Sequence, residues 1–473
     1  MIPKEIPLEI YEAHRGLSEW NAKFLEFMLD NPEGLNRAHF NSVVKNPVFN
    51  YYRLQPWPTF INGKVKSELK TVCMKVFDLL KSIPERLFNY DFDSIAQYYE
   101  LPGDFCRLVL EGIGKDFLDR MPGRGDFMIS PDHGIRCIEY NANANLGGWE
   151  QDFLENIYAS IPVISKFLTV NHLRIRSSYF LVNALEHILE NALKHFGTTP
   201  EGKINTALVH EKYSNETQDG LDVFLKQTYK QVLGGINHQL EGELVICDFS
   251  RLNPVNESVR LDGKPIHVII EWCMGKVPSW VMPMVKRGNL MLYNGPIMDI
   301  MANKLSLALL SEFQNSDLFN HEERETIKSH IPWSRKLIPG ETTYENDDTG
   351  AVPIRLENFV ISHQERLVLK AGIGYGGYQV IMGAEVPPSQ WKQQVEKALS
   401  EKTWVVQEYI KPTAFIYQSG ETGCEPHQVV WGVFLFGSRS PGGFVRVLPE
   451  KSHSHVINLN QGSEQSITLE VEE

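Results

Sequence analysis

The sequence predicts a mixed α/β protein in which a small parallel αβ domain follows a helical N-terminal region. Between residues 201 and 300, short apolar runs alternate with helical segments, which is typical of strands buried in a parallel sheet. Residues 1–120 instead repeat their apolar residues every three to four positions, as amphipathic helices do. At 473 residues the chain is long enough for about three domains.

Composition and charge limit the classes of partner. The apolar share of 42% and the aromatic share of 11% are those of a folded globular protein, and the net charge of −13 disfavours nucleic acid and anionic membranes. No basic-then-apolar signal pattern opens the chain, and no apolar run approaches the ~18 residues of a membrane span. The six cysteines show no C-x-x-C spacing. We therefore expect a reduced, cytoplasmic protein with small-molecule partners; the oligomeric state is not encoded in any pattern.

The N-terminal region is predicted to be mainly helical. Apolar residues at spacings of three and four predict amphipathic helices at 17–29 and 65–83. Such patterns usually serve packing, so no functional residue is assigned to this region.

Residues 123–148 are the first segment along the chain that suggests a functional site. A strand is predicted at 126–129, a turn at 131–134 and a second strand at 135–140. Glu139 and Asn141 are two residues apart and therefore share a face, and hairpin pairing can place Asp126 opposite Glu139. Two carboxylates and an amide oxygen on one face suit Mg²⁺. The alternative is that both acids are ordinary solvated strand residues.

An asparagine- and glycine-rich run follows the second strand. Asn141, Asn143 and Asn145 alternate with other residues before Gly147 and Gly148. Both residue types are poor strand formers, so the run favours a ligand-facing loop. It therefore strengthens the hypothesis of a metal site in the adjoining hairpin.

The parallel αβ domain is predicted next. Its strands are the apolar runs at 206–209, 244–247, 267–270 and 290–293, and an amphipathic helix at 220–233 lies between the first two.

Lys304 lies at the opening of a leucine-rich helix that follows this domain. A positive charge near a helix N-terminus is unfavourable with respect to the helix dipole unless an anion is bound there as well. Lys304 therefore indicates a phosphate contact.

The glycine-rich stretch at 366–382 carries the strongest signal. An apolar run ending in Lys370 and a second one at 378–382 flank glycines at positions 372, 374, 376 and 377, which predicts a β-hairpin with a bare backbone at its tip. Such a tip can place N–H groups against phosphate oxygens. The spacing also matches a dinucleotide-binding fingerprint, but that motif opens a helix, and a kinase glycine loop would need His-Arg-Asp and Asp-Phe-Gly motifs that are absent. A purely structural hairpin is the remaining alternative.

The next predicted strand is the apolar run at 404–406. It continues into alternating polar and apolar residues, which can bind a purine. Backbone groups and Gln407 or Glu408 would meet the edge of the base, while Ile410 would cover a face.

Two antiparallel strands are predicted at 429–436 and 443–447, with Arg446 in the second. A lone strand arginine is usually a surface residue, but beside a phosphate site it can neutralise charge on a transferred phosphoryl group.

Taken together, these motifs resemble the ATP-grasp ligases, and more closely the circularly permuted branch that is similar to glutathionylspermidine synthetase. The matching segments are GRGDF…IEYNANAN, NGP…NKLSLALL, IPWSR, LVLKAGIGYGG…GAE…W, WVVQEYI and GGFVRV…INLNQG. The acidic motif precedes both lysines, as in the permuted branch, and the resemblance covers residues 120–465. It leaves the helical N-terminal region uncovered. With that region, the chain is expected to have four parts: a helical region (1–120), a metal-binding hairpin with core helices (121–200), the αβ domain (201–300) and an ATP-grasp lid and core (301–473).

The resemblance also implies a role for each matching residue. The ATP phosphates would be bound by Lys304 and Lys370 and covered by Gly374, Tyr375, Gly376 and Gly377. Adenine would be held by Gln407, Glu408, Tyr409 and Ile410, and Mg²⁺ by Asp126, Glu139 and Asn141. The acyl phosphate would face Arg124 and Arg446.

The implied activity is an ATP- and Mg²⁺-dependent ligation of a carboxylate to an amine through an acyl phosphate, with small molecules or peptides as substrates. The alternatives are a phosphotransferase on the same fold and a nucleotide-binding protein without catalysis. The asparagine run at 141–145 departs from the Asp/Ser/Thr-containing versions of the branch, so glutathione and spermidine are not assumed as substrates.

Overall fold

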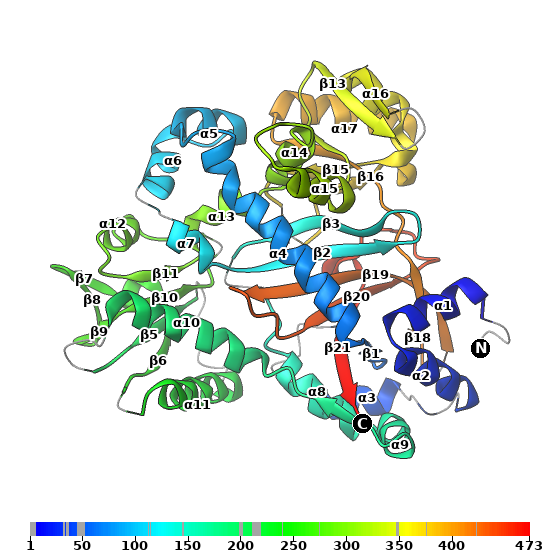
Figure 1. Ribbon diagram of the computed structural model, residues 1–473, viewed down its shortest axis with the longest axis horizontal. Helices are drawn as coiled ribbons and strands as arrows, with labels where there is room; N and C mark the ends of the chain where they lie inside the picture. Colours follow the sequence, from blue (N-terminus) through cyan, green and yellow to red (C-terminus); the bar gives the residue numbers. More distant parts are fainter. Residues whose placement is uncertain are drawn as a thin grey trace.

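A large, mostly antiparallel sheet forms the centre of the molecule (Figure 1). The computed structural model describes residues 6–31, 34, 37–44, 53–111, 113, 115–143, 146–197, 202–210, 219–238, 240–273, 275–346, 350–374, 376–421 and 423–473. The strands of the central sheet are β1 (Thr59–Phe60), β2 (Pro122–Ser130), β3 (Gly134–Asn141), β4 (Arg174–Arg176), β18 (Ala414–Ser419), β19 (Gly423–Phe436), β20 (Gly443–Pro449) and β21 (Glu464–Glu472). Their order is β1-β21-β20-β19-β2-β3, and β18 also pairs with β19 and β4 with β21.

The hairpin predicted at 126–140 is confirmed and extends further at both ends, since β2 and β3 pair from Arg124–Asn141 to Ser130–Gly134. The antiparallel pair predicted near the end of the chain is also confirmed as β19 and β20. The central sheet therefore joins segments that are about 300 residues apart in the sequence.

Helix α4 (Gly63–Arg86) crosses one face of this sheet (Figure 1). The Asn62 side chain caps its N-terminus by accepting a hydrogen bond from the Val65 amide at 2.8 Å. Its apolar stripe is buried, and the Phe77 ring stacks on Tyr140 of β3 with centroids 4.8 Å apart. The helix predicted at 65–83 is thus confirmed as the element that covers the sheet.

The helix predicted at 17–29 is confirmed as α2 (Glu19–Asp30), and a separate helix, α1 (Leu8–Leu17), precedes it. Ser18 separates them because its backbone is extended and its hydroxyl accepts a hydrogen bond from the Asn21 amide. The other helices before and after the β2–β3 hairpin are α3 (Arg37–Val43), α5 (Phe92–Tyr99), α6 (Gly103–Leu110), α7 (Lys115–Asp119), α8 (Gln151–Ser160) and α9 (Pro162–Val170).

The predicted parallel αβ unit is confirmed. Its strands are β5 (Thr206–Val209), β6 (Leu244–Cys247), β10 (Val268–Glu271) and β11 (Met291–Tyr293), all parallel in the order β11-β10-β5-β6. One face packs against α10 (Phe180–Phe196) and α11 (Asp219–Ile236). The other packs against α12 (Val281–Lys286) and a meander of β7 (Asn253–Val255), β8 (Ser258–Leu261) and β9 (Lys264–Ile266). Burial on both faces explains why its strands are almost continuously apolar.

A second antiparallel sheet, in the order β12-β17-β15-β16, lies beside α14 and α15 (Figure 1). Its strands are β12 (Ser334–Lys336), β15 (Leu367–Ala371), β16 (Val380–Met382) and β17 (Trp404–Glu408). Nearby elements are α13 (Met298–Met301), α14 (Lys304–Glu312), α15 (His321–His330), β13 (Glu341–Asn346), β14 (Gly350–Arg355), α16 (Leu356–Ser362) and α17 (Pro388–Glu401). The fully buried Trp391 of α17 anchors the core of this unit.

The structure thus confirms a mixed α/β fold. Short 3₁₀ turns connect its elements at Phe249–Arg251, Gly295–Ile297, Gln364–Arg366, Gly383–Glu385 and Leu459–Gln461. Within the described residues, no helix combines the length and apolar character that crossing a bilayer requires.

Candidate nucleotide and metal site

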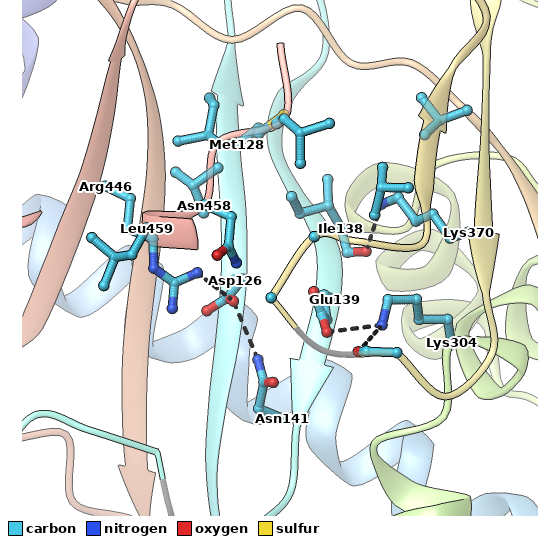
Figure 2. Close-up of a pocket in the computed structure, with 18 of the residues that line it drawn as sticks. Asp126, Met128, Ile138, Glu139, Asn141, Lys304, Lys370, Arg446, Asn458 and Leu459 are labelled. Atoms are coloured by element: carbon cyan, nitrogen blue, oxygen red, sulfur yellow. Dashed lines mark hydrogen bonds and ion pairs between the residues drawn. The ribbon is translucent and has the colours of Figure 1, made fainter. Parts of the chain in front are cut away.

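A cavity of about 460 Å³ lies between the central sheet and the β12-β17-β15-β16 sheet, and we call it the main cavity. Every described residue of the predicted site lines it: Arg124, Asp126, Glu139, Asn141, Lys304, Lys370, Gly374, Gly376, Gly377, Gln407, Glu408, Tyr409, Ile410 and Arg446. Tyr375 lies outside the described residues. The cavity has two walls, and Figure 2 shows Asp126, Glu139, Asn141 and Arg446 on one side and Lys304 and Lys370 on the other. We call the first the sheet wall, formed by the predicted residues of β2, β3 and β20. The second is the lid wall, formed by Lys304, Lys370, Gly374, Gly376, Gly377, Gln407, Glu408, Tyr409 and Ile410.

On the sheet wall, Asp126 is the centre of a buried ionic group. It lies opposite Glu139 in the β2–β3 register, as predicted, beside a β-bulge. The Arg124 guanidinium binds it in bidentate fashion at 2.6 and 2.9 Å, and Arg446 lies 3.4 Å from one of its oxygens. The Asn141 amide donates to the same oxygen at 3.2 Å (Figure 2). Burial alone would raise the pKa of Asp126, but the two arginines hold it below its usual value.

The two arginines of the sheet wall share a second partner. The guanidinium carbons of Arg124 and Arg446 lie 5.0 and 4.7 Å from the ring centroid of Phe444. Nε of Arg446 is buried and has no hydrogen-bond partner among the described residues. Burial and the neighbouring Arg124 charge lower the pKa of Arg446. Two guanidinium groups thus meet at one carboxylate, and the charges of Glu139 and Glu150 add a further attraction on Arg124.

On the lid wall, Lys304 connects three segments. It is the first residue of α14, which the Asn303 side chain caps by accepting from the Leu305 amide. The Lys304 ammonium pairs with Glu139 at 2.9 Å and donates to the Gly374 carbonyl at 3.3 Å (Figure 2). The cation therefore links β3, α14 and the glycine loop.

Lys370 is held differently, by neutral acceptors. Its ammonium donates to Oε1 of Gln407 at 2.6 Å and to the Ile138 carbonyl at 3.2 Å. Burial lowers the pKa of Lys370 to about 8, with the Lys304 charge adding to the effect and the Glu139 charge opposing it. The Gln407 amide in turn donates to the Ser334 hydroxyl at 3.1 Å. The Gln407 side chain, expected at the edge of a purine, is thus engaged in orienting the lysine.

The glycine loop fits closely against the segment at 456–461. Gly376 and Gly377 have φ values of 68° and 73°, which favour glycine. A Cβ on Gly377 would lie 2.9 Å from the Val456 side chain, and one on Gly376 would overlap the Asn460 amide. The loop thus leaves a bare backbone facing the cavity, as the sequence predicts.

The far end of the main cavity is apolar. Ile410 packs with Met128, Val430, Leu448 and Ile457, all of them buried. The backbone amides of residues 408 and 409 donate to the carbonyls of residues 333 and 366, which fixes the path of the chain at the end of β17. This end has the width and character to receive an aromatic base.

Several lining residues were not predicted. They include Met128, Ile138, Leu146, Glu150, Val380, Met382, Phe444, Asn458, Leu459 and Gln465. Some carried a signal: Met128 shares a strand face with Asp126 by the two-residue period. Asn458 lies in the INLNQG segment of the family resemblance, from which no role was assigned to it.

The donor set fits a hard cation that shares phosphate ligands. No group of three or more His, Cys, Asp or Glu side chains in the described ranges is arranged to hold a metal. Mg²⁺ bound with nucleotides commonly takes only one or two carboxylates and completes its shell with phosphate oxygens and water. Asp126, Glu139 and the Asn141 amide oxygen supply such a partial set, and the buried Oδ1 of Asn143, which has no hydrogen-bond partner among the described residues, is a further oxygen donor nearby.

No protein-family model and no curated protein matches the sequence. Among solved structures, the chain is similar to a glutathione synthetase-like effector from Globodera pallida in its apo form, with a TM-score of 0.56 and 14% identity over 99% of this chain and 98% of that one. The chain has a glutathione synthetase-like fold. A structure described as "Putative gamma-glutamylcysteine synthetase", from Methylobacillus flagellatus KT, matches with a TM-score of 0.36 and 12% identity over 85% of this chain and 87% of that one.

Proposed function

We propose that the protein is an ATP- and Mg²⁺-dependent ligase that joins a carboxylate to an amine through an acyl phosphate and releases ADP and phosphate. The observation that carries the proposal is the convergence in one cavity of two buried lysines, the buried Arg124, the largely buried Arg446 and the Asp126–Glu139 pair. The sequence motifs support an assignment to the circularly permuted ATP-grasp branch, and the glutathione synthetase-like fold agrees with a ligase.

The charge pattern supports a polyphosphate ligand. Four cationic side chains line the cavity together with the carboxyl groups of Asp126, Glu139, Glu150 and Glu408, and burial raises the pKa of Glu150. Lys370 has no carboxylate within hydrogen-bonding distance among its described contacts. Buried cations gain most from an anion that shares their low-dielectric surroundings. The phosphates would lie by Lys304, Lys370 and the glycine loop, and the base would lie by Ile410.

Mg²⁺ would be held by Asp126, Glu139 and Asn141 and would neutralise charge on the phosphate oxygens. In the reaction, an oxygen of the substrate carboxylate attacks the γ-phosphorus of ATP, the bond to the β–γ bridging oxygen breaks, and ADP leaves with the electron pair. The amine nitrogen then attacks the acyl carbon, phosphate departs, and the amine loses a proton to solvent.

In this scheme Arg446 and Arg124 stabilise charge that grows on the transferred phosphoryl group and on the tetrahedral adduct. Their rigid placement supports the role, because each guanidinium is fixed by Asp126 and Phe444 before any substrate binds. The lysines, in contrast, would bind the phosphates of the ground state. We further propose a cytoplasmic location and small-molecule or peptide substrates for both the acid and the amine.

The test is a screen of carboxylic acids against amines, measured by ADP release and by the mass of the product. ADP release that requires both an acid and an amine, together with an amide product, is the expected result. A phosphorylated acceptor formed without any amine would establish a phosphotransferase instead. Tight ATP binding with no turnover across the screen would contradict catalysis and leave a nucleotide-binding protein.

A further inference from the structure

A second, much smaller cavity lies behind the glycine loop. It is lined by Glu139, Asn141 and Asn143, by Met298, Asp299 and Ala302 from α13 and its end, and by Ile373 and Gly374. Its volume of about 10 Å³ has room for the centre of one water-sized particle. Four of these eight residues have side chains that carry oxygen donors, so the cavity suits a single small cation or a water molecule and excludes a substrate.

Asn143 is the first indication that this cavity holds a ligand. The residue is 6% exposed, and Oδ1 of its side chain is buried without a hydrogen-bond partner among the described residues. Buried polar atoms are nearly always paired with protein, water or an ion. An orphaned amide oxygen lining an ion-sized cavity therefore points to a coordinated species.

Asp299 is the second indication. Its carboxylate is partly buried, and none of the hydrogen bonds or ion pairs found among the described residues involves it. The side chain of Asn303 donates a hydrogen bond to the backbone carbonyl of Asp299 and not to its carboxylate. A carboxylate withdrawn from water without a cationic partner is unfavourable, so its burial beside Asn143 is explained if a cation lies between them.

We propose that this cavity is a binding site for a divalent cation, formed by the carboxylates of Glu139 and Asp299 and the amide oxygens of Asn141 and Asn143. An all-oxygen set with two carboxylates is the ligand chemistry of hard divalent ions. Lys304 pairs with one oxygen of Glu139, which leaves the other for the cation.

This site goes beyond the proposed function because it is built from protein donors alone. It shares Glu139 and Asn141 with the expected Mg²⁺–ATP ligands, whereas Asp299 and Asn143 belong to it specifically. The cation would lie directly behind Ile373 and Gly374. It would thus fix the glycine loop before any nucleotide binds.

The test is Mn²⁺ titration of the full chain without nucleotide, followed by electron paramagnetic resonance and by thermal unfolding. We expect one Mn²⁺ per chain and a melting temperature that rises with Mn²⁺. Asp299→Asn should weaken binding by about ten-fold or more, the size typical of losing a group that supports a metal. Asp262→Asn, which removes one negative charge from an exposed ion pair in the αβ unit, should bind Mn²⁺ as the wild type does.

Asn143→Asp should change the Mn²⁺ affinity in the opposite direction to Asp299→Asn, because a carboxylate in place of the amide should tighten Mn²⁺ binding. This variant decides the question if Asp299→Asn fails to fold. The titration contains no nucleotide, so the cation site and the ATP site can fail separately. The proposal is overturned if the wild type binds no Mn²⁺ without nucleotide, or if neither Asp299→Asn nor Asn143→Asp alters the affinity.

Discussion

The two walls of the main cavity hold their buried cations in different ways. On the sheet wall, Arg124 and Arg446 share one carboxylate, Asp126, and one aromatic ring. On the lid wall, the hydrogen bonds of Lys370 within the described ranges go only to the Gln407 side chain and a backbone carbonyl. A compensated guanidinium pair is rigid and pre-organised, whereas a lysine among neutral acceptors is ready to bind an anion. The comparison suggests that the sheet wall serves the chemistry and the lid wall serves nucleotide binding.

The comparison is most strongly tested by removing the carboxylate that the two arginines share. Asp126→Asn should destabilise the protein by about 3–5 kcal/mol, because two buried guanidinium groups lose their counter-charge. Urea unfolding followed by circular dichroism measures the loss. As a control, Glu396→Gln breaks an exposed helix pair with Lys392 and should cost less than about 1 kcal/mol. Equal small losses in both variants would mean that Asp126 is not the electrostatic centre of the sheet wall.

The catalytic role of the sheet wall is tested at Arg446. Arg446→Ala should bind ATP nearly as the wild type does yet lose about 10²–10³ in kcat, because its contact strengthens only as charge develops. Arg446→Lys should restore little, since one ammonium cannot replace a planar, two-pronged donor. Calorimetric ATP binding and steady-state rates on the same preparations separate the two effects. Normal turnover in Arg446→Ala would remove the residue from the chemistry.

The lid wall should show the reverse pattern. Lys370→Met keeps the aliphatic stem and removes the charge, so ATP affinity should fall by about 10- to 100-fold, the value of a hydrogen bond to a charged group. Lys304→Met should weaken ATP binding as well and should also release Glu139. The exposed Lys392→Met is the matched control and should bind ATP normally. ATP affinity that is untouched by both buried substitutions would refute the nucleotide site.

The smallest expected effect is a pH dependence specific to the lid wall. Burial lowers the pKa of Lys370 to about 8, so the side chain carries its charge below that value and loses it as the pH rises further. ATP affinity should therefore fall by up to about ten-fold between pH 7 and pH 9. The decline should be absent in Lys370→Met and present in Arg446→Ala, as isothermal titration at each pH would show. A decline of the same size in Lys370→Met would assign it to another group.

The sequence was most informative where a pattern of apolar residues is compatible with only one kind of secondary structure. The strands at 206–209 and 244–247 were predicted to the residue because both faces of a parallel sheet are buried. The pairing of Asp126 with Glu139 followed from a two-residue period and a recognisable turn.

Other features depended on cues that periodicity does not capture. The break at Ser18 rests on one capping hydroxyl, and the meander at 253–266 turns at Asp262-Gly263, a hairpin signal that the apolar pattern overshadowed. The contact between Lys370 and Gln407 joins neighbouring strands and has no local signature. The approach of residues 456–461 to the glycine loop likewise depends on the complete fold.

The close fit between the glycine loop and residues 456–461 also constrains how this sequence can diverge. Gly377 faces Val456, and Gly376 faces Asn460, with too little space for a methyl group on either glycine. A larger residue at 376 or 377 would be tolerated only if its partner some 80 positions later became smaller, and positive φ at both glycines narrows the choice further. The two segments are therefore expected to change together in related chains, as one inherited unit.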